Sequence, residues 1–423
     1  MRSTGRSAKE DILQQRTLVG PGLLAALIAS LLAALLVPQP ASGEMIASER
    51  GFAVDLPEGF SYSDGDGKNR FSFVDPNQGM EFDLFVYDPG RFAGAGDIAD
   101  SVISKLGSKG QRDDFVYEGR KSVFIELLFD LDGVQKRGYG IAIAGRPAPA
   151  PQGAEAPTGA EAPAGTPAAV DYSFALLSYT DAASFQAYSD FVLSTLDCFS
   201  IDRLALRSPG PVSQYVLPFP AAREATKTVD FEGKSLKLPW SDDEASQVHD
   251  TANREYQVLE AYAGDDKLWR AAWARFYRMI YRESARRLDH LAAALDPLLP
   301  DDPTDAARDL LKWAQDWTYE SDQNGIGFTD PLTASMEARG DCDSRAMVLA
   351  ILLERRGIDA ILMVSRDYAH ALVGIDVPGG GQRFAFDGKN WLVGETTAHV
   401  GLGMIAASQA DWSKWMGIKL GEE

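Results

Sequence analysis

Apolar and polar residues alternate in several short runs between residues 51 and about 203. The alternation lies at 51–60 and 80–87, and further strand candidates lie at 122–129, 138–144 and 172–179. Because successive side chains of a strand point to opposite faces, this alternation predicts half-buried β-strands. Apolar residues at helical spacing predict helices over 97–106 and 185–196. The pattern therefore predicts a domain in which strands and helices are mixed.

The segment 146–169 interrupts this pattern, since it consists almost wholly of Pro, Ala, Gly, Glu and Thr. Such a composition cannot form a packed core and predicts a disordered loop. Strand signals resume at Tyr172, so the loop interrupts a domain and does not separate two. The following segment, 204–240, reads as a Pro- and Ser-containing linker with a short hairpin around Glu232-Gly233.

From residue 241 onward the pattern is helical. Ser241 followed by Glu244 is an N-terminal capping signal for a helix to about residue 262. A longer helix is predicted from about Asp266 to Leu295. Its largely aromatic stripe is typical of a core and consists of Trp269, Trp273, Phe276, Tyr277, Ile280 and Tyr281. Thr304 is expected to cap a third helix.

Three residue types that can form a thiol active site follow in order near the C-terminus. Cys342 follows Gly340 and begins an apolar helix, in which Asp343 or Ser344 can help to cap the first turn. The N–H groups and dipole of a helix N-terminus stabilise a thiolate, so we expect a lowered thiol pKa. His370 then opens a predicted strand. Two further strands, 383–386 and 391–395, form a hairpin around Asp387-Gly388.

This stretch resembles the core of the transglutaminase-like family. The resemblance is carried by the segments 339–347 (RGDCDSRAM), 357–360 (GIDA), 369–371 (AHA) and 391–397 (WLVGETT). It implies that Cys342 is the nucleophile and His370 the base. Glu395 occupies the position in which the family usually has aspartate, and Asp387 is the alternative acid. One expected donor of the oxyanion hole is the Cys342 backbone N–H, and Tyr319, Gln323 and Asn324 are candidates for the second donor.

The region 44–203 resembles a second family, the PsbP-like proteins. The matching segments are 52–60, 117–120, 178–179 and 196–200. The resemblance implies an α/β/α sandwich that serves as a binding or positioning unit. The expected fold is therefore α+β, with a papain-like transglutaminase core at 241–423, formed by helices packed on an antiparallel sheet, after a PsbP-like domain.

The implied reaction is acyl transfer through a Cys342 thioester, with a protein or peptide as the substrate. Hydrolysis of peptide, isopeptide or glutamine amide bonds is favoured, because water needs no dedicated acceptor site. Cross-linking to an amine and a non-enzymatic binding or scaffold role are the alternatives. No metal or organic cofactor is implied, since none of the four histidines has a second ligand at a metal-binding spacing.

Charge and the N-terminus determine the expected compartment and partners. The chain of 423 residues has a formal net charge of −20, and no Lys/Arg-rich run follows residue 16, which argues against nucleic acid. A basic start, an apolar run over 23–37 and small residues at 41–43 predict a cleaved secretory signal, residues 1–43. We therefore expect an exported protein, periplasmic or secreted. The alternative is an uncleaved membrane anchor over 18–37. Contact with a membrane is expected only in that case. The two cysteines are too few for a disulfide scaffold, and their pairing stays open.

Overall fold

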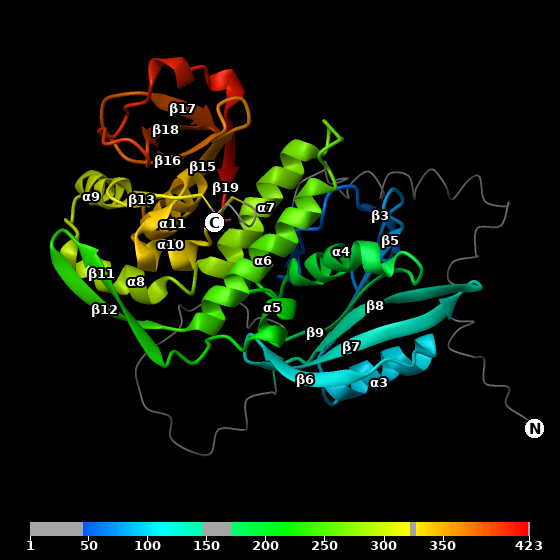
Figure 1. The fold of residues 1–423 in the computed structure, drawn as a ribbon. Coiled ribbons are helices and arrows are strands. Elements are labelled where there is room, and N and C mark those ends of the chain that lie inside the picture. Colours follow the sequence, from blue (N-terminus) through cyan, green and yellow to red (C-terminus); the bar gives the residue numbers. More distant parts are fainter. Residues whose placement is uncertain (1–44, 147–170, 322–326, 422–423) are drawn as a thin grey trace, which may run out of the picture. The chain divides into compact units, whose positions relative to one another are not determined.

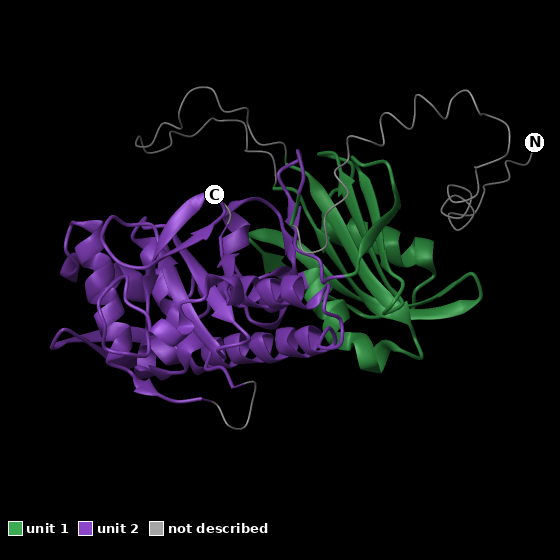
Figure 2. Cartoon of the chain, turned by 90° about the horizontal axis from the view of Figure 1, so that it is seen from above, with its two compact units in different colours: residues 1–46, 59–196 green, residues 47–58, 197–423 purple. Residues whose placement is uncertain are grey.

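The computed structural model describes residues 45–146, 171–321 and 327–421. The chain forms two compact units, residues 1–46 with 59–196 and residues 47–58 with 197–423, of which the structure describes the ranges given above (Figure 2). The predicted signal, 1–43, and nearly all of the predicted loop 146–169 lie outside the described residues. Within the described ranges, no helix is long and apolar enough to cross a membrane. Helices are combined with several antiparallel sheets, which confirms the α+β class.

The first unit is built on a seven-stranded antiparallel sheet (Figure 1). In spatial order its strands are β3 (Ser61–Gly65), β4 (Arg70–Asp75), β5 (Met80–Tyr87), β9 (Ser173–Asp181), β8 (Val134–Ile143), β7 (Arg120–Leu131) and β6 (Arg112–Tyr117). Buried and partly buried residues alternate along β5, whose bounds are those predicted from the alternation. Periodicity therefore identified this strand because one of its faces is more deeply buried than the other.

Two helices pack on this sheet, and both were predicted from apolar spacing. They are α3 (Ala95–Leu106) and α4 (Phe185–Asp197). Ile98 of α3 packs in one core cluster with Ile125 of β7. Phe185 at the start of α4 packs edge-on against Tyr139 of β8, whose side chain points to the other face of the sheet. The two helices therefore pack on opposite faces.

The second unit contains short strands and a helical region. The short strands of the chain are β1 (Ile46–Ala47), β2 (Ala53–Val54), β10 (Phe199–Ser200), β11 (Ala225–Phe231), β12 (Lys234–Trp240), β13 (Thr318–Tyr319) and β14 (Arg339–Gly340). The α-helices are α5 (Pro211–Val216), α6 (Asp242–Glu260), α7 (Trp269–Ser284), α8 (Asp289–Leu295), α9 (Pro303–Gln315), α10 (Pro331–Glu337) and α11 (Cys342–Arg355). Single 3₁₀ turns are η2 (Leu204–Arg207), η3 (Asp296–Leu298), η4 (Ala407–Gln409) and η5 (Trp412–Lys414).

The prediction of one long helix from Asp266 to Leu295 is wrong, because α7 and α8 are separate. Arg287 lies at the break. Its side-chain Nε donates to the carbonyl oxygen of Glu283, which the Arg287 backbone N–H would use in a continuous helix. The same guanidinium pairs with the carboxylates of Glu283 at 2.7 Å and Glu244 at 3.0 Å. A buried ion cluster therefore holds Arg287 at the break between the two helices.

The helix caps agree with the sequence at one position and differ at another. Ser241 caps α6, as predicted, and its hydroxyl accepts from the Glu244 backbone N–H. The prediction that Thr304 caps α9 is wrong. The cap is Asp302, whose Oδ1 accepts from the backbone N–H groups of Thr304 at 2.9 Å and Asp305 at 3.0 Å. A carboxylate two residues earlier therefore takes the role assigned to the hydroxyl.

The C-terminal part of the second unit is a five-stranded antiparallel sheet. In spatial order its strands are β17 (Arg383–Phe386), β18 (Lys389–Gly394), β16 (His370–Ile375), β15 (Ala360–Ser365) and β19 (Met416–Lys419). Helix α11 packs against β15 and β16. An apolar cluster that includes Met363, Leu372 and Trp391 forms a core on this sheet. The strand that opens at His370 and the hairpin around Asp387-Gly388 both have the predicted form.

Residues 47–58 belong to the second unit, although they begin the region 44–203 that resembles PsbP-like proteins. Within the second unit, Arg278 donates to both carboxylate oxygens of Asp55, at 2.8 and 2.7 Å, and Arg275 donates to its carbonyl oxygen at 2.6 Å. Burial alone would raise the pKa of Asp55, but the Arg278 charge and hydrogen bonds lower it below its ordinary 3.8. This segment is therefore fixed by buried charges.

We expect Asp55→Asn to lower the free energy of unfolding of the second unit by about 2–4 kcal/mol at pH 7, because Arg278, which is only 16% exposed, would lose its anion. Since the pKa of Asp55 is lowered in the fold, its contribution is present above pH 3.8 and is lost as the pH falls further. The deficit of the variant should therefore shrink in acid. All eight tryptophans lie between residues 240 and 415, so tryptophan fluorescence during urea unfolding reports on this unit.

The matched control for this measurement is Asp305→Asn, which removes a solvent-exposed ion pair with Arg308. Its expected effect is below about 1 kcal/mol. Equal losses in the two variants would contradict a structural role for Asp55.

Candidate active site

Cys342 is the first residue of α11 and follows a tight turn. Gly340 has φ of 157°, and a Cβ there would meet the Ser344 Cβ at 2.8 Å, so the turn requires glycine. The helix cap is Asp341, whose Oδ1 accepts from the Ser344 backbone N–H at 2.9 Å and hydroxyl at 2.7 Å. The prediction that Asp343 or Ser344 caps the helix is wrong, since the cap precedes the cysteine and Ser344 is its donor.

The electrostatics around the thiol differ from those expected at a helix N-terminus. Cys342 is only 7% exposed. Burial, followed by the negative charges of Asp343 and Asp341, raises the thiol pKa, while the backbone N–H groups of Ala371 and Asp343 oppose this shift. The prediction of a lowered pKa is therefore wrong, because it omitted burial and the two flanking carboxylates. The thiol is neutral at rest and needs a base to become a nucleophile.

His370 and Glu395 form a hydrogen-bonded pair. His370 is the first residue of β16, and its Nε2 lies 2.8 Å from Glu395 Oε2. The other carboxylate oxygen, Oε1, accepts from the backbone N–H and the hydroxyl of Thr397, each at 2.7 Å. Burial acts to raise the pKa of Glu395, but His370 and Thr397 together lower it. An ionised Glu395 favours a proton on Nε2 and leaves Nδ1 to act as the base.

The pair lies beside the thiol. The Cys342 sulfur interacts with the backbone N–H of Ala371, the residue after His370. The charge of His370 also lowers the pKa of Asp343, next to Cys342. The structure therefore brings Cys342, His370 and Glu395 into one site, although they are far apart in the sequence.

The alternative acid, Asp387, lies elsewhere. It has φ of 49° in the turn between β17 and β18 and forms an ion pair with Lys419. The carboxylate bonded to His370 is that of Glu395.

Among the candidate oxyanion donors, the structure describes only Tyr319. It pairs with Gly340 in the register of β13 and β14, and its pKa is raised by burial and then by the thiolate form of nearby Cys342. Tyr319 therefore lies near the thiol but is 61% exposed. Gln323 and Asn324 lie outside the described residues.

Asp343 and Tyr277 are residues of the site that sequence analysis did not identify. Tyr277 of α7 is buried and forms a side-chain hydrogen bond with Asp343. Burial and the charge of Asp341 raise the pKa of Asp343 to about 7. Tyr277 was assigned to an apolar stripe, and its hydroxyl is the only signal in the sequence that it could contact a polar site.

Arg345 was also not identified, and it connects the segments that carry the site. Its side chain is buried, and its hydrogen bonds go to backbone carbonyls. The distances are 3.0 Å to Gly340, 3.2 Å to Thr396, 2.7 Å to Trp317 and 3.3 Å to Ala314. Gly340 precedes Cys342 and Thr396 follows Glu395, so Arg345 is a positioning residue for both.

We expect Asp343→Asn to accelerate alkylation of Cys342 by iodoacetamide at pH 8, because the variant removes a negative charge that raises the thiol pKa. Each pKa unit corresponds to about tenfold in thiolate fraction, so the rate should rise roughly threefold to tenfold. Asp343 is ionised only above its own pKa of about 7, so the difference should diminish below pH 6.

Mass spectrometry of the Cys342 peptide separates this reaction from that of buried Cys198. The control is Asp387→Asn, which should alkylate at the native rate. Slower alkylation of the Asp343 variant at pH 8 would refute the electrostatic account.

Comparison with known proteins yields only distant structural likeness. No family model and no curated protein sequence matches the chain. The solution structure of cyanobacterial PsbP (CyanoP) from Synechocystis sp. PCC 6803 has a TM-score of 0.28 and 10% identity, covering 39% of this chain and 95% of that one. A crystal structure from Bacteroides thetaiotaomicron VPI-5482 has a TM-score of 0.23 and 10% identity, covering 57% of this chain and 78% of that one. At these scores neither likeness carries an argument about activity, and the chemistry must be inferred from the site itself.

Proposed function

We propose that the second unit is a transglutaminase-like thiol hydrolase that cleaves peptide, isopeptide or glutamine amide bonds through a thioester on Cys342. The observation that carries the proposal is the His370–Glu395 hydrogen bond beside the Cys342 sulfur. The packing of α11 on the antiparallel strands β15 and β16, together with the sequence motifs around all three residues, supports a papain-like core.

In the first half of the proposed reaction, His370 Nδ1 takes the thiol proton as the sulfur attacks the amide carbonyl. The carbonyl π electrons move to its oxygen, which the backbone N–H of Cys342 at the helix N-terminus can stabilise. Reforming the carbonyl breaks the C–N bond, and the imidazolium gives its proton to the leaving amine. Glu395 stabilises the imidazolium without taking its proton.

In the second half, His370 removes a proton from water, whose oxygen attacks the thioester carbon. The C–S bond breaks, the sulfur regains a proton from His370, and the carboxylic acid leaves. An amine in place of water would give a new amide, which is the cross-linking alternative.

The first test is to incubate the full-length protein with a mixed peptide library, with and without a primary amine, and to identify the products by mass spectrometry. New carboxyl termini or deamidated glutamine support hydrolysis, whereas amine adducts support cross-linking. An acid quench should trap an acyl group on the Cys342 peptide. The control Cys342→Ala should give neither product nor adduct, and unchanged turnover in that variant would end the proposal.

A non-enzymatic binding role is the second candidate, and the raised thiol pKa is the observation that favours it. A protein with this role would show no turnover and no acyl adduct. The first unit is proposed as a binding module in either case.

Export also stays a proposal, because the segment 1–43 lies outside the described residues. N-terminal sequencing of the protein isolated from its own cells distinguishes a cleaved signal from an anchor at 18–37. A mature chain that begins near residue 44 supports cleavage, whereas an intact N-terminus in the membrane fraction supports the anchor.

A further inference from the structure

A cavity of about 460 Å³ lies in the second unit, and its lining includes Arg366 of the turn that precedes His370. Its walls come from the first half of α7, from the turn between β15 and β16, and from residues 413–416. Residues of two of these walls are in contact with neighbours of Cys342 and His370.

The first wall is an aromatic ladder on α7. Trp269 and Trp273 line the cavity, and their ring centroids are 6.3 Å apart. The ring centroids of Trp273 and Tyr277 are also 6.3 Å apart. Tyr277 is hydrogen-bonded to Asp343, which follows Cys342. Residues four apart share one helix face, so the three rings form one row on α7 that ends at Tyr277. Both tryptophans are only half-buried, although the sequence pattern assigned them to the core.

The second wall lies close to the His370 imidazole. Trp415 packs edge-on against His370 with centroids 6.2 Å apart, and its neighbours Lys414 and Met416 line the cavity. Arg366, in the turn that precedes His370, lines it as well. The cavity walls are therefore linked to the two groups that the proposed reaction uses, through Tyr277 to Asp343 beside the thiol and through Trp415 to the imidazole, and neither group lines the cavity itself.

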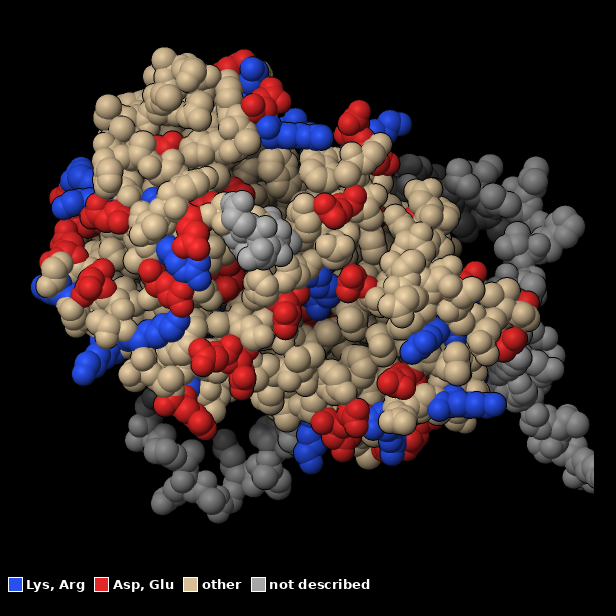
Figure 3. All heavy atoms as spheres, viewed as in Figure 1, with Lys and Arg blue, Asp and Glu red and all other residues tan. Residues whose placement is uncertain are grey.

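Cations outnumber acids in the cavity. Arg270, Arg366 and Lys414 face two carboxylates, those of Asp266 and Asp367. The closest ion pair, Lys414 with Asp367, is long at 3.8 Å, and Arg366 lies over the Trp269 ring at 5.4 Å. By contrast, the whole chain carries a formal charge of −20, and on the face in Figure 3 the cations are scattered among acids.

We propose that this cavity binds an acidic segment of an extended peptide substrate and places the adjoining amide at Cys342. Carboxylates of the substrate would pair with Arg270, Arg366 and Lys414, and its apolar portions would lie on the two tryptophans. This inference rests on the proposed function of Cys342 and names the class of substrate.

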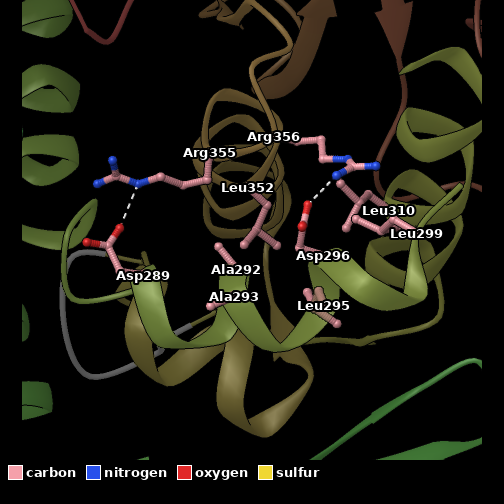
Figure 4. A pocket seen from close by; sticks show the side chains of 10 residues that line it. All are labelled: Asp289, Ala292, Ala293, Leu295, Asp296, Leu299, Leu310, Leu352, Arg355 and Arg356. Atoms are coloured by element: carbon pink, nitrogen blue, oxygen red, sulfur yellow. Dashed lines mark hydrogen bonds and ion pairs between the residues drawn. The ribbon is translucent and has the colours of Figure 1, made fainter. Parts of the chain in front are cut away.

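A second cavity provides a matched control, because its cations are already neutralised (Figure 4). It has about 410 Å³ and is lined by α8, α9 and the C-terminal end of α11. Arg355 pairs there with Asp289 at 2.9 Å, and Arg356 pairs with Asp296. Helix α11 has 14 residues, so this cavity lies about 20 Å along the helix axis from Cys342.

The experiment measures binding of three fluorescent peptides to the Cys342→Ala protein. The peptides share one sequence, taken from a product of the library test or otherwise from a neutral Gly/Ser/Ala peptide with a central Gln, and differ in three adjacent residues that are all Glu, all Gln or all Lys. We expect the Glu peptide to bind roughly tenfold more tightly than the Gln peptide at low salt, since each of three exposed ion pairs raises the affinity by roughly twofold.

In this binding test, the double variant Arg270→Gln/Arg366→Gln should reduce the preference at least about threefold, while Arg355→Gln should keep it. Equal affinities, tighter binding of the Lys peptide or an effect of Arg355→Gln equal to that of the double variant would overturn the inference.

Cleavage by the native protein separates the two proposals. Cleavage of all three peptides at equal kcat/KM would refute the acidic preference and leave the Cys342 chemistry standing. Selective binding of the Glu peptide, without cleavage of any peptide and without an acyl adduct, would refute the enzyme and leave the acidic-peptide site standing.

Discussion

Replacing His370 by alanine is expected to reduce kcat/KM for amide hydrolysis by about 10⁴- to 10⁶-fold. The Cys342 thiol pKa is raised by burial and by Asp343 and Asp341, so little thiolate forms spontaneously at neutral pH. The reaction therefore depends on proton transfer to the imidazole during attack. Initial rates measured between pH 6 and 9 check this expectation, and the loss should be smallest at high pH, where hydroxide replaces the base.

The matched control is His399→Ala. The His399 side chain is 70% exposed and lies 3.6 Å from Asp316. Native activity is expected for it across the same pH range. A loss below about tenfold for His370→Ala, or equal losses for both histidines, would contradict the assignment of His370 as base.

Replacing Glu395 by glutamine is expected to reduce kcat/KM by about 10³- to 10⁴-fold with little change in fold. Two donors of Thr397, its N–H and its hydroxyl, both point at Oε1. They will hold the amide oxygen of the glutamine at that position, so the amide NH₂ faces His370 Nε2. An NH₂ donor there requires an unprotonated Nε2, which moves the proton to Nδ1. The imidazole can then no longer accept the thiol proton.

The comparison for this variant is Asp387→Asn, which removes only the exposed ion pair with Lys419. Activity within about twofold of native is expected, because exposed pairs contribute little. A nuclear magnetic resonance titration of the His370 ring distinguishes the two tautomers in Glu395→Gln. If Asp387→Asn were the more damaging change, the triad acid would be Asp387.

Much of the fold was predictable from the sequence. An element that buries only one face repeats apolar residues at a regular spacing, and this spacing identifies it as a strand or a helix. β5 has the predicted bounds, and β16 begins at His370 as expected. The break between α7 and α8 could not be predicted from the sequence. At the break, Arg287 pairs with Glu244 of another helix, and no local pattern reports a partner 43 residues away.

The candidate site was also predictable in part, from the order of its residues along the chain. The order of Cys342, His370 and Glu395 is visible in the chain, and the structure places them together. The thiol electrostatics were not predictable, since they depend on burial as well as on position in the helix. The role of Arg345 was equally hidden, because its partners are backbone carbonyls, which every residue carries.

The assignment of residues 47–58 to the second unit has a consequence for biosynthesis. All of residues 59–196 leave the ribosome before Phe199 can pair with Val54 or Arg278 can reach Asp55. The first unit can complete its sheet early in synthesis. The Asp55 carboxylate stays solvated until the helix that carries its arginine partners has been synthesised. A fragment that starts at residue 204 would omit this segment altogether and leave the cationic side chains of α7 facing water.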